Sequence, residues 1–360
     1  MDRRSAIRHA GIASVLATGM SPAVHAQTAV RWRLASSFPK SLDTIYGGAT
    51  VFAREVKALS AGRFEIEVHA AGELMPAFGV LDAVQGGTVE IAHTAPYYFY
   101  ARNQAFALGS AIPFGFNARQ MNAWMLHGNG RRLMDEFYAG YNMVSFAGGN
   151  TGTQMGGWYL KEIRHGTDFK GMRMRLGGGL VGEVMAAMGV IPVDMPGGEI
   201  YEALQKRSID AAEWVGPYDD QKLGLNKVAP YYYYPGWWEG GLELDFLVNR
   251  KAYEALPAEY RAIVRAASSL SHADMLAKYD ALNPNALKQL VVAKTKVLPF
   301  SLPVLDASFR AAMEVFALNE SRSAQWKKIY ADMRNFQRDQ IFWYRFAEAR
   351  YDSFMSAQRI

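Results

Sequence analysis

Cysteine is absent from the 360-residue sequence, and histidine is scarce, with only seven residues. Without cysteine the chain can form no disulfide, no catalytic thiolate and no cysteine-based zinc site. The histidines show no HExxH pattern and no pair four residues apart, and no G-x-S-x-G motif occurs. Zinc-dependent and nucleophilic catalysis therefore lack candidate residues, which favours a binding protein over an enzyme.

A strong net charge is also absent. The formal charge is +5, and no dense run of lysine and arginine is present, so nucleic acid is not an expected partner. Apolar residues make up 50% and charged residues 20% of the chain, as in a soluble globular protein. The length predicts about two domains.

The N-terminus has the features of a secretory signal. Met1–Arg8 is short and basic, and Ala10–Met20 is apolar but far shorter than the ~20 residues of a membrane-spanning helix. Val24 and Ala26 are small residues at the −3 and −1 positions, which predicts a signal peptide over residues 1–26. The pair Arg3-Arg4 is compatible with twin-arginine export. The mature protein is expected in the periplasm.

Strand and helix patterns alternate along the mature chain, which predicts an α/β protein with mainly parallel sheets. From about Tyr253 the chain is mostly helical, punctuated by Pro257 and Pro284. The chain crosses between two lobes more than once, and a ligand is expected in the cleft between them. The predicted strands are Val30–Ala35, Phe64–Ala70, Val89–His93 and Val144–Gly149, then Gln154–Tyr159, Met172–Leu176 and Ile209–Trp214, with a return to the first sheet at Leu244–Asn249.

One glycine motif, Gly177–Gly182, fits the G-x-G-x-x-G pattern of dinucleotide-binding proteins. The strand before it contains Arg173 and Arg175, whereas the first strand of such a fold is apolar throughout. No acidic residue follows at a second strand end at the required spacing. A nucleotide-dependent oxidoreductase is therefore the weaker interpretation, and a glycine loop over a bound anion is favoured.

Arginine and glutamate side chains are the candidate binding groups. Arg173 and Arg175 share one face of their strand, and an arginine at a strand end can clamp a carboxylate, although a solvated strand face accounts for the pattern equally well. Glu213 and Glu239 occur in aromatic surroundings. Two carboxylates about 4 Å apart repel by roughly 4 kcal/mol at an effective dielectric of 20, so a shared dry pocket would require a proton or a cation. Oxygen ligands alone favour sodium, calcium or magnesium.

The spacing of Glu213 and Glu239 is compatible with two further roles. They could form the acid and base pair of a glycosidase, or belong to a carbohydrate-binding protein whose tryptophans stack on sugar. They could also be two unrelated carboxylates at the rim of a cleft.

Several long segments of unusual composition carry a family resemblance: Trp32–Asp43, Ala71–Leu74, Gly148–Gly152, Gln154–Trp158, Gly171–Arg175, Glu213–Asp220 and Ala229–Gly240. They resemble TRAP-transporter solute-binding proteins of the DctP type, most closely the TakP-like branch that binds 2-oxo acids. The resemblance implies a two-lobed periplasmic solute-binding fold with hinge strands, a lobe-spanning helix and a helical C-terminus. The implied divisions are lobe I at 27–149 plus about 240–280, lobe II at 150–239 plus about 281–335, and a dimerisation helix at about 336–360.

The resemblance also implies a function and a site. The function is capture of a 2-oxo or 2-hydroxy monocarboxylate, such as pyruvate or lactate, for uptake through TRAP membrane subunits, with no catalysis. Arg175 would pair with the ligand carboxylate, and the cation, with sodium favoured over calcium, would be held by Gln154, Glu213, Trp214 (through its backbone carbonyl) and Glu239. The polar and aromatic walls would be Asn150, Tyr97 and Tyr98.

Two further expectations concern Pro96 and the C-terminus. Thr94-Ala95-Pro96 departs from the family pattern, and because proline lacks an N–H donor, a backbone contact there is in doubt. The C-terminal run contains more aromatic residues than one helix face usually buries, and the resemblance implies dimerisation through a C-terminal helix. A homodimer is therefore expected, with packing on the chain's own second lobe as the alternative. These aromatics include Phe342, Trp343, Tyr344, Phe346 and Tyr351.

Overall fold

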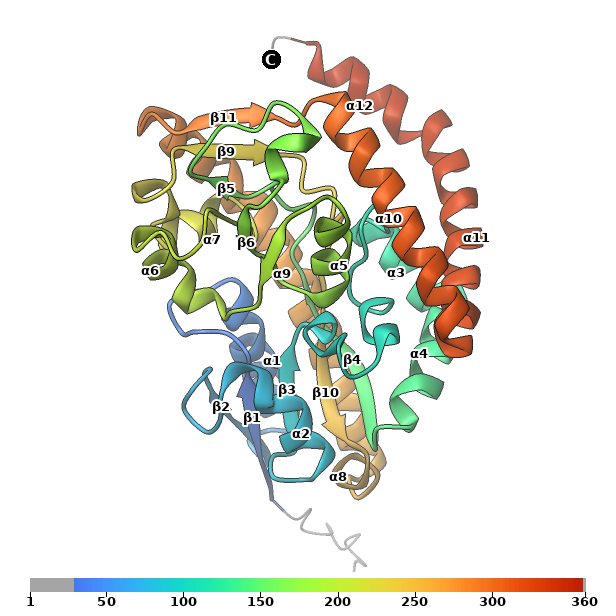
Figure 1. Cartoon of the computed structure of the whole chain (residues 1–360). Helices are drawn as coiled ribbons and strands as arrows, with labels where there is room; N and C mark the ends of the chain where they lie inside the picture. The colour runs from blue at the N-terminus through green and yellow to red at the C-terminus, as the bar shows by residue number, and fades with distance from the viewer. Residues whose placement is uncertain (1–28, 359–360) are drawn as a thin grey trace, which may run out of the picture.

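The computed structural model describes residues 29–358, so the predicted signal peptide at residues 1–26 lies outside the described part of the chain. The described chain forms two lobes, each built on a β-sheet with helices packed against it (Figure 1). In that view the first sheet lies in the lower lobe and the second in the upper lobe. The predicted two-lobed α/β fold is confirmed.

The first sheet has the strand order β2-β1-β3-β10-β4. Strand β1 pairs in parallel with β2 and β3, whereas β10 runs antiparallel to β3 and β4. The predicted alternation is present in β1, where Trp32 and Leu34 are buried and Arg31 and Arg33 are exposed. The elements of this lobe are β1 Val30–Ser36, α1 Ile45–Leu59, β2 Phe64–His69, α2 Val80–Gln85, β3 Ile91–Thr94, α3 Ala118–His127, α4 Gly130–Ala139, β4 Met143–Asn150, β10 Glu243–Asn249 and α8 Arg250–Glu254.

The second sheet has the strand order β11-β9-β5-β8-β6-β7 and consists of short strands. Strand β6 pairs in parallel with both β7 and β8, as the alternating strand and helix pattern predicts. The elements of this lobe are β5 Trp158–Tyr159, β6 Arg173–Arg175, α5 Gly179–Ala187, β7 Ile191–Val193, α6 Ile200–Gln205, β8 Ala211–Ala212, α7 Pro217–Lys222, β9 Tyr231–Tyr234 and β11 Lys296–Pro299.

Two strands that the sequence pattern predicts in this sheet are reduced to two residues each. The predicted strand Gln154–Tyr159 pairs in the sheet only at Trp158–Tyr159, because Gly157 adopts a φ of +83° and turns the backbone before it. The predicted strand Ile209–Trp214 is reduced to Ala211–Ala212, and the chain then leaves the sheet toward α7, which begins at Pro217. The residues released from both strands approach the candidate site.

The lobes are joined by strand ends and by one long helix. Strand β4 ends at Asn150 and β10 begins at Glu243, and these two residues are paired neighbours. Helix α9, Ala258–Val292, packs on α1 and β4 of the first lobe and on α7 of the second. The sequence predicts a break at Pro284, but that residue lies inside α9. A helix can continue through proline where packing on both lobes offsets the lost hydrogen bond.

The C-terminal helices form a separate layer along one side of the molecule (Figure 1). They are α10 Leu302–Arg322, α11 Ala324–Phe346 and α12 Glu348–Ser356. Helix α11 packs against α3 and α4, where Trp326 and Tyr330 are buried. Residues 336–346 thus complete α11, and a bend at Ala347 separates them from α12.

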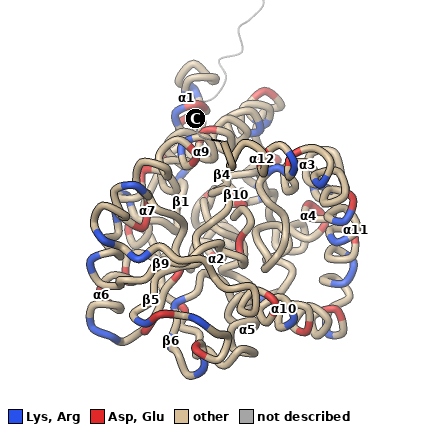
Figure 2. Tube along the Cα trace, turned by 90° about the horizontal axis from the view of Figure 1, so that it is seen from above, with Lys and Arg blue, Asp and Glu red and all other residues tan. Residues whose placement is uncertain are grey.

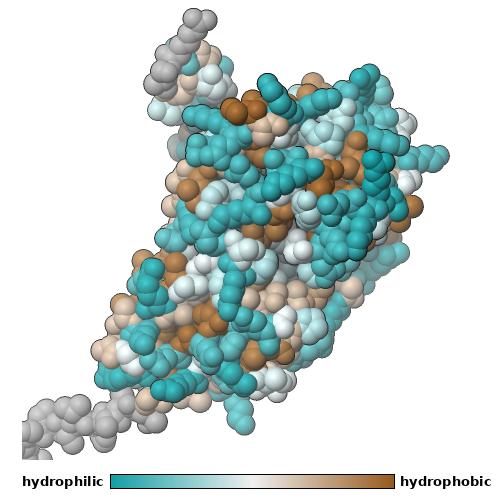
Figure 3. Space-filling model, turned by 90° about the vertical axis from the view of Figure 1, so that its left-hand side faces the viewer, coloured by the Kyte–Doolittle hydropathy of each residue, from teal (hydrophilic) through white to brown (hydrophobic). Residues whose placement is uncertain are grey.

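Charge and hydropathy are distributed as in a protein with a water-exposed surface. Most charged residues lie on the outer helices (Figure 2). The flank shown in Figure 3 is covered largely by hydrophilic residues, with hydrophobic residues in small separate groups. Within residues 29–358 no helix combines the length and hydrophobicity needed to cross a membrane.

Candidate functional site

A buried ion pair between Arg175 and Glu213 forms the centre of the candidate site. Strands β6 and β8 are parallel neighbours in which Arg175 lies beside Ala212, so the next residue of that chain, Glu213, reaches the guanidinium. Nη1 of Arg175 donates to Oε1 of Glu213 at 2.6 Å and to the Glu213 carbonyl at 2.8 Å. Both side chains are 1% exposed. The structure therefore brings these two predicted site residues into one buried cluster.

Further contacts fix the orientation of the Arg175 guanidinium. Its Nε donates to the Met195 carbonyl at 3.0 Å, and its Cζ lies 5.0 Å from the centre of the Trp214 ring. The hydroxyl of Tyr98 also interacts with it. Protein acceptors therefore hold the guanidinium at Nε and Nη1 in a fixed orientation, and its planar shape matches that of a carboxylate.

Backbone hydrogen bonds, rather than strand pairing, bring Gln154 and Glu239 together. The Gln154 N–H donates to the Glu239 carbonyl at 3.1 Å, and the Gly236 N–H donates to the Gln154 carbonyl at 2.9 Å. Both side chains are buried. The amide nitrogen of Gln154 donates to the Thr151 hydroxyl at 3.2 Å, which leaves its Oε1 acceptor directed elsewhere.

Four buried oxygen atoms in this cluster lack a hydrogen-bond donor. They are Oε1 of Gln154, Oε2 of Glu213 and both carboxylate oxygens of Glu239. A buried acceptor without a donor costs about 1–3 kcal/mol, and more when it is charged. The chemistry of this donor set, all oxygen and partly anionic, fits a hard cation. Residues 29–358 contain no group of three or more His, Cys, Asp or Glu side chains arranged for a metal, and here only two of the four predicted donors are carboxylates.

Burial dominates the protonation of the two glutamates. It raises the pKa of Glu213 to about 7, although the Arg175 guanidinium opposes the shift. Burial, followed by repulsion from Glu213, raises the pKa of Glu239 well above its ordinary value. The Tyr97 hydroxyl interacts with Glu239 without forming a hydrogen bond of normal geometry. The pair therefore retains a proton near neutral pH unless another positive charge replaces it.

The two tyrosines reach the cluster from the first lobe. They lie on a short 3₁₀ turn, Pro96–Phe99, in which Pro96 is the first residue, a position where a missing N–H leaves no hydrogen bond unmade. Proline thus initiates the turn that presents Tyr97 and Tyr98. Tyr97 is buried and Tyr98 is partly buried.

The glycine motif, Gly177–Gly182, allows the tyrosines of the first lobe to pack closely against the second lobe. A Cβ on Gly177 would lie 2.6 Å from the Tyr97 hydroxyl and 2.8 Å from Oε1 of Glu213, and one on Gly178 would lie 2.7 Å from the Tyr97 ring. A Cβ on Gly179 would likewise lie 2.6 Å from the Tyr100 ring. Aromatic rings therefore occupy the space where a dinucleotide pyrophosphate would approach the loop, which argues against the nucleotide interpretation.

Asn150 is positioned beside the cluster but is held by protein groups. Its Nδ2 donates to Glu243 at 2.9 Å, and its Oδ1 accepts from the Gly152 N–H at 2.9 Å. The structure therefore places Asn150 at the junction of β4 and β10, with both ends of its amide engaged.

Sequence reasoning did not assign the residues that hold the lobes together. Asp43 of the first lobe is ion-paired with Lys222 of α7 and with Lys278 of α9, the latter at 3.1 Å. Asp219, fully buried, accepts hydrogen bonds from Thr44 of the first lobe and from Tyr279 of α9. Asp43 and Asp219 both belong to segments with the family resemblance, but only the folded chain shows that they make contacts across the lobes.

Asp220 supports the backbone of the candidate site through hydrogen bonds. It accepts from the Trp158 indole at 2.9 Å, from the Tyr232 hydroxyl at 2.7 Å and from the Val215 N–H at 3.1 Å. These bonds fix the backbone that follows Glu213 and Trp214.

Comparison with known proteins places this geometry in a family. The profile of DctP, bacterial extracellular solute-binding protein family 7, matches residues 35–321. The chain belongs to the DctP family. This family comprises TRAP-transport solute-binding proteins rather than enzymes, so the glycosidase and oxidoreductase alternatives are not supported.

Individual relatives are similar over nearly the whole chain. A monocarboxylate 2-oxoacid-binding periplasmic protein of Nostoc sp. is 44% identical over the full length of both chains. A TRAP transporter solute-binding protein of Bordetella bronchiseptica, solved as a dimer with copurified calcium and picolinate, is 45% identical with a TM-score of 0.91, covering 92% of this chain and 98% of its own. A TRAP periplasmic solute-binding protein of Pseudoalteromonas atlantica, solved with sodium and pyruvate, is 36% identical with a TM-score of 0.87, covering 92% and 99%.

Proposed function

We propose that this DctP-family protein is the periplasmic solute-binding subunit of a TRAP transporter and captures a 2-oxo or 2-hydroxy monocarboxylate of the pyruvate type together with a cation. The observation that carries the proposal is the buried cluster of one arginine and four acceptor oxygens without donors. An arginine is suited to a carboxylate, and acceptors that lack donors are suited to a metal ion. Relatives described as binding 2-oxo acids or pyruvate support the same ligand class.

The cation would be held by side-chain oxygens of Gln154, Glu213 and Glu239 and by the backbone carbonyl of Trp214. When bound, it would neutralise the two glutamates and supply a positive charge to the ligand oxygens. Sodium is the favoured ion of our proposal, and calcium is the alternative that binding measurements must compare. Relatives contain either ion.

The ligand carboxylate would pair with the Arg175 guanidinium, near the tyrosines and the Trp214 ring. A 2-oxo or 2-hydroxy oxygen next to the carboxylate would complete the cation's coordination, so an acid without that oxygen is expected to bind less tightly. Asn150 would act as a polar wall by keeping the adjacent backbone in place, since both ends of its amide contact protein groups.

Closure of the lobes would bury the complex and create the surface that TRAP membrane subunits recognise. Contacts of Asp43 and Asp219 across the lobes would help to hold them together. Export would depend on the signal peptide at residues 1–26, through the general or the twin-arginine route.

We also infer a homodimer formed through α11 and α12. Five aromatic side chains on these helices are 57–70% exposed: Phe342, Trp343, Phe346, Tyr351 and Phe354. A grouping of this kind is typical of a surface that is covered by a partner. The dimer described for the Bordetella bronchiseptica relative supports the inference.

Calorimetry with pyruvate, 2-oxobutyrate and lactate, each with and without sodium or calcium, tests the function. We expect binding of at least one of the acids and a marked loss of affinity when the cation is removed. Absence of binding to all three acids would contradict the ligand class. Unchanged affinity of the Arg175→Ala variant would contradict the role of the arginine, with Arg173→Ala as the matched control on the same strand.

A further inference from the structure

A second cavity, separate from the Arg175 cluster, lies between α3, α4, β4, β10 and the first half of α9. Its volume is about 810 Å³, within the range of small-molecule sites. We call it the hinge groove because its floor includes Glu243, which is paired with Asn150 where the strands pass from one lobe to the other. None of the residues that line it belongs to the Arg175 cluster.

The floor of the hinge groove contains a buried histidine whose ring nitrogens are poorly satisfied by the protein groups around them. His272 of α9 is 8% exposed, and neither of its ring nitrogens makes a hydrogen bond of normal geometry. The polar groups beside it are the Glu243 carboxyl, 3.5 Å from Nδ1, and the backbone of Gly149. Buried polar atoms normally have partners, so this histidine marks a place where a polar ligand atom would be accepted.

Three arginines form the rim of the hinge groove: Arg131 and Arg132 on α4 and Arg265 on α9. Arg131 is oriented by Asp135, at 2.9 Å, and lies over the Phe146 ring with its Cζ 5.3 Å from the ring centre. The acidic groups that line the groove are Asp135 and Glu243. Burial raises the pKa of Glu243 to about 8, so that carboxyl is largely neutral at pH 7 and the groove has a net positive charge.

The walls of the hinge groove are apolar. They include Met125, Phe146 and Leu126, and Leu126 is 74% exposed. A cationic rim, apolar walls and a polar floor together suit an anion that has an apolar part. A fully hydrated inorganic ion would leave the walls uncovered, and a neutral apolar molecule would leave the arginines without a ligand to pair with.

We propose that the hinge groove binds a small organic carboxylate, with its anionic end paired to Arg131 and Arg265 and its apolar part on Met125 and Phe146. This site is independent of the proposed pyruvate site, because the two share no lining residue. Glu243, which lines the groove, accepts a hydrogen bond from Asn150. The bound acid therefore contacts the strands that connect the lobes.

Fluorine NMR titration of the mature protein with 4-fluorobenzoate tests the proposal, and 4-fluorobenzamide serves as the neutral control. We expect saturable binding of the acid and at least tenfold weaker binding of the amide. Titration of the Arg175→Ala variant separates the two sites: equal affinity for the probe assigns it to the hinge groove even if pyruvate binding fails.

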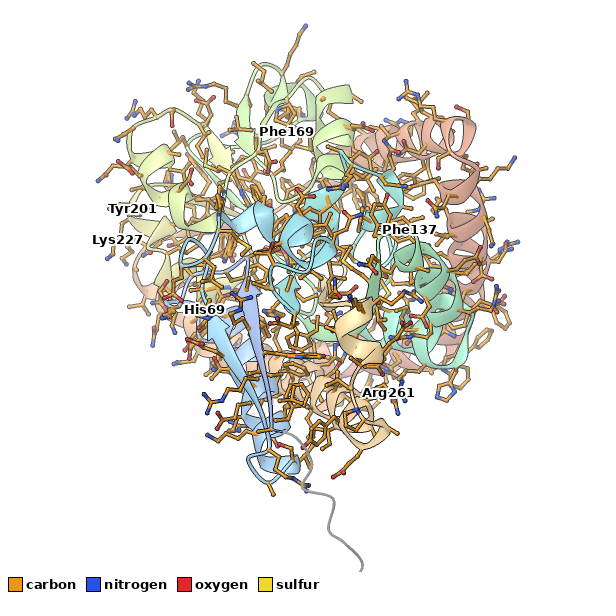
Figure 4. All side chains as sticks on the ribbon, turned by 90° about the horizontal axis from the view of Figure 1, so that it is seen from below. His69, Phe137, Phe169, Tyr201, Lys227 and Arg261 are labelled. Carbon is orange, nitrogen blue, oxygen red and sulfur yellow. The ribbon has the colours of Figure 1, made fainter. Side chains whose placement is uncertain are left out.

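The double variant Arg131→Gln/Arg265→Gln is expected to bind 4-fluorobenzoate at least tenfold less tightly. Arg261→Gln is the matched control, because Arg261 is one turn before Arg265 on α9 and does not line the groove. Figure 4 shows Arg261 apart from α4, the helix on which Phe137 is labelled. Should the double variant fail to fold, the two single variants are measured instead. Absence of saturable binding, or full affinity in the arginine variants, would overturn the proposal.

Discussion

Replacement of Glu239 by glutamine separates the two opposing effects that this carboxylate has on the protein. Glutamine keeps the shape of the side chain and removes the charge. In the ligand-free protein, both carboxylate oxygens of Glu239 are buried without donors and its pKa is raised well above the ordinary value. The substitution is therefore expected to stabilise the ligand-free protein and to weaken cation-dependent binding.

The magnitude of each effect follows from the buried charge. If Glu239 remains protonated at pH 7, its proton uptake relative to an unfolded glutamate of pKa about 4.3 costs up to about 4 kcal/mol, at about 1.4 kcal/mol per pH unit. Because the folded pKa is raised, this cost is absent below about pH 4 and grows as the pH rises. Removal of one partner from a buried charged pair costs about 3–5 kcal/mol, so affinity for pyruvate with its cation should fall about 150- to 4,000-fold.

Thermal unfolding of the cation-free, ligand-free protein and calorimetry with pyruvate and sodium or calcium measure the two effects. Glu213→Gln is the matched comparison, because Oε1 of Glu213 is paired with Arg175 at 2.6 Å. That variant should also lose affinity, but its ligand-free form should be destabilised, since the buried guanidinium loses its counter-ion. Cation-dependent pyruvate binding that survives in Glu239→Gln would refute the assignment of Glu239 to the cation.

Three further predictions concern lobe closure, pH and assembly. Gly177→Ala places a Cβ against the Tyr97 hydroxyl. The resulting overpacking costs about 1–3 kcal/mol and should weaken pyruvate binding about 5- to 150-fold in calorimetry. The control is Gly198→Ala, where a Cβ meets open space, and equal affinity of the two variants would contradict the prediction. Burial, together with nearby acidic charge, raises the pKa of Asp245 to about 8, so the free energy of unfolding falls as the pH rises from about 4 to 8. In Asp245→Asn, urea unfolding should show this pH dependence reduced by up to about 1.4 kcal/mol per pH unit. An identical pH dependence in the variant and the wild type would contradict the prediction. Phe346→Asp should convert the dimer to a monomer in light scattering with pyruvate affinity unchanged; a monomeric wild-type protein would rule the dimer out.

Local sequence pattern was sufficient for much of the fold. Alternation of Trp32 and Leu34 with arginines predicted β1 correctly, because a strand half buried on one face requires this period. The return of the chain to the first sheet at Leu244–Asn249 was also predicted, and it corresponds to β10. The pattern failed at Gln154–Tyr159 and at Pro284, where a positive-φ glycine and packing on two lobes, respectively, decided the backbone.

By itself the sequence determined the family and supplied the residue types of the candidate site, because long segments of unusual composition are properties of the chain alone. Only the tertiary structure decided that Arg175 and Glu213 touch, through the register of β6 and β8, and that Gln154 meets Glu239 through backbone hydrogen bonds. It also gave the glycine motif its role, since the space above Gly177 and Gly178 is taken by Tyr97 of the other lobe. Such contacts join residues far apart in the chain, and their distances depend on how strands pair and lobes close, which no local pattern specifies.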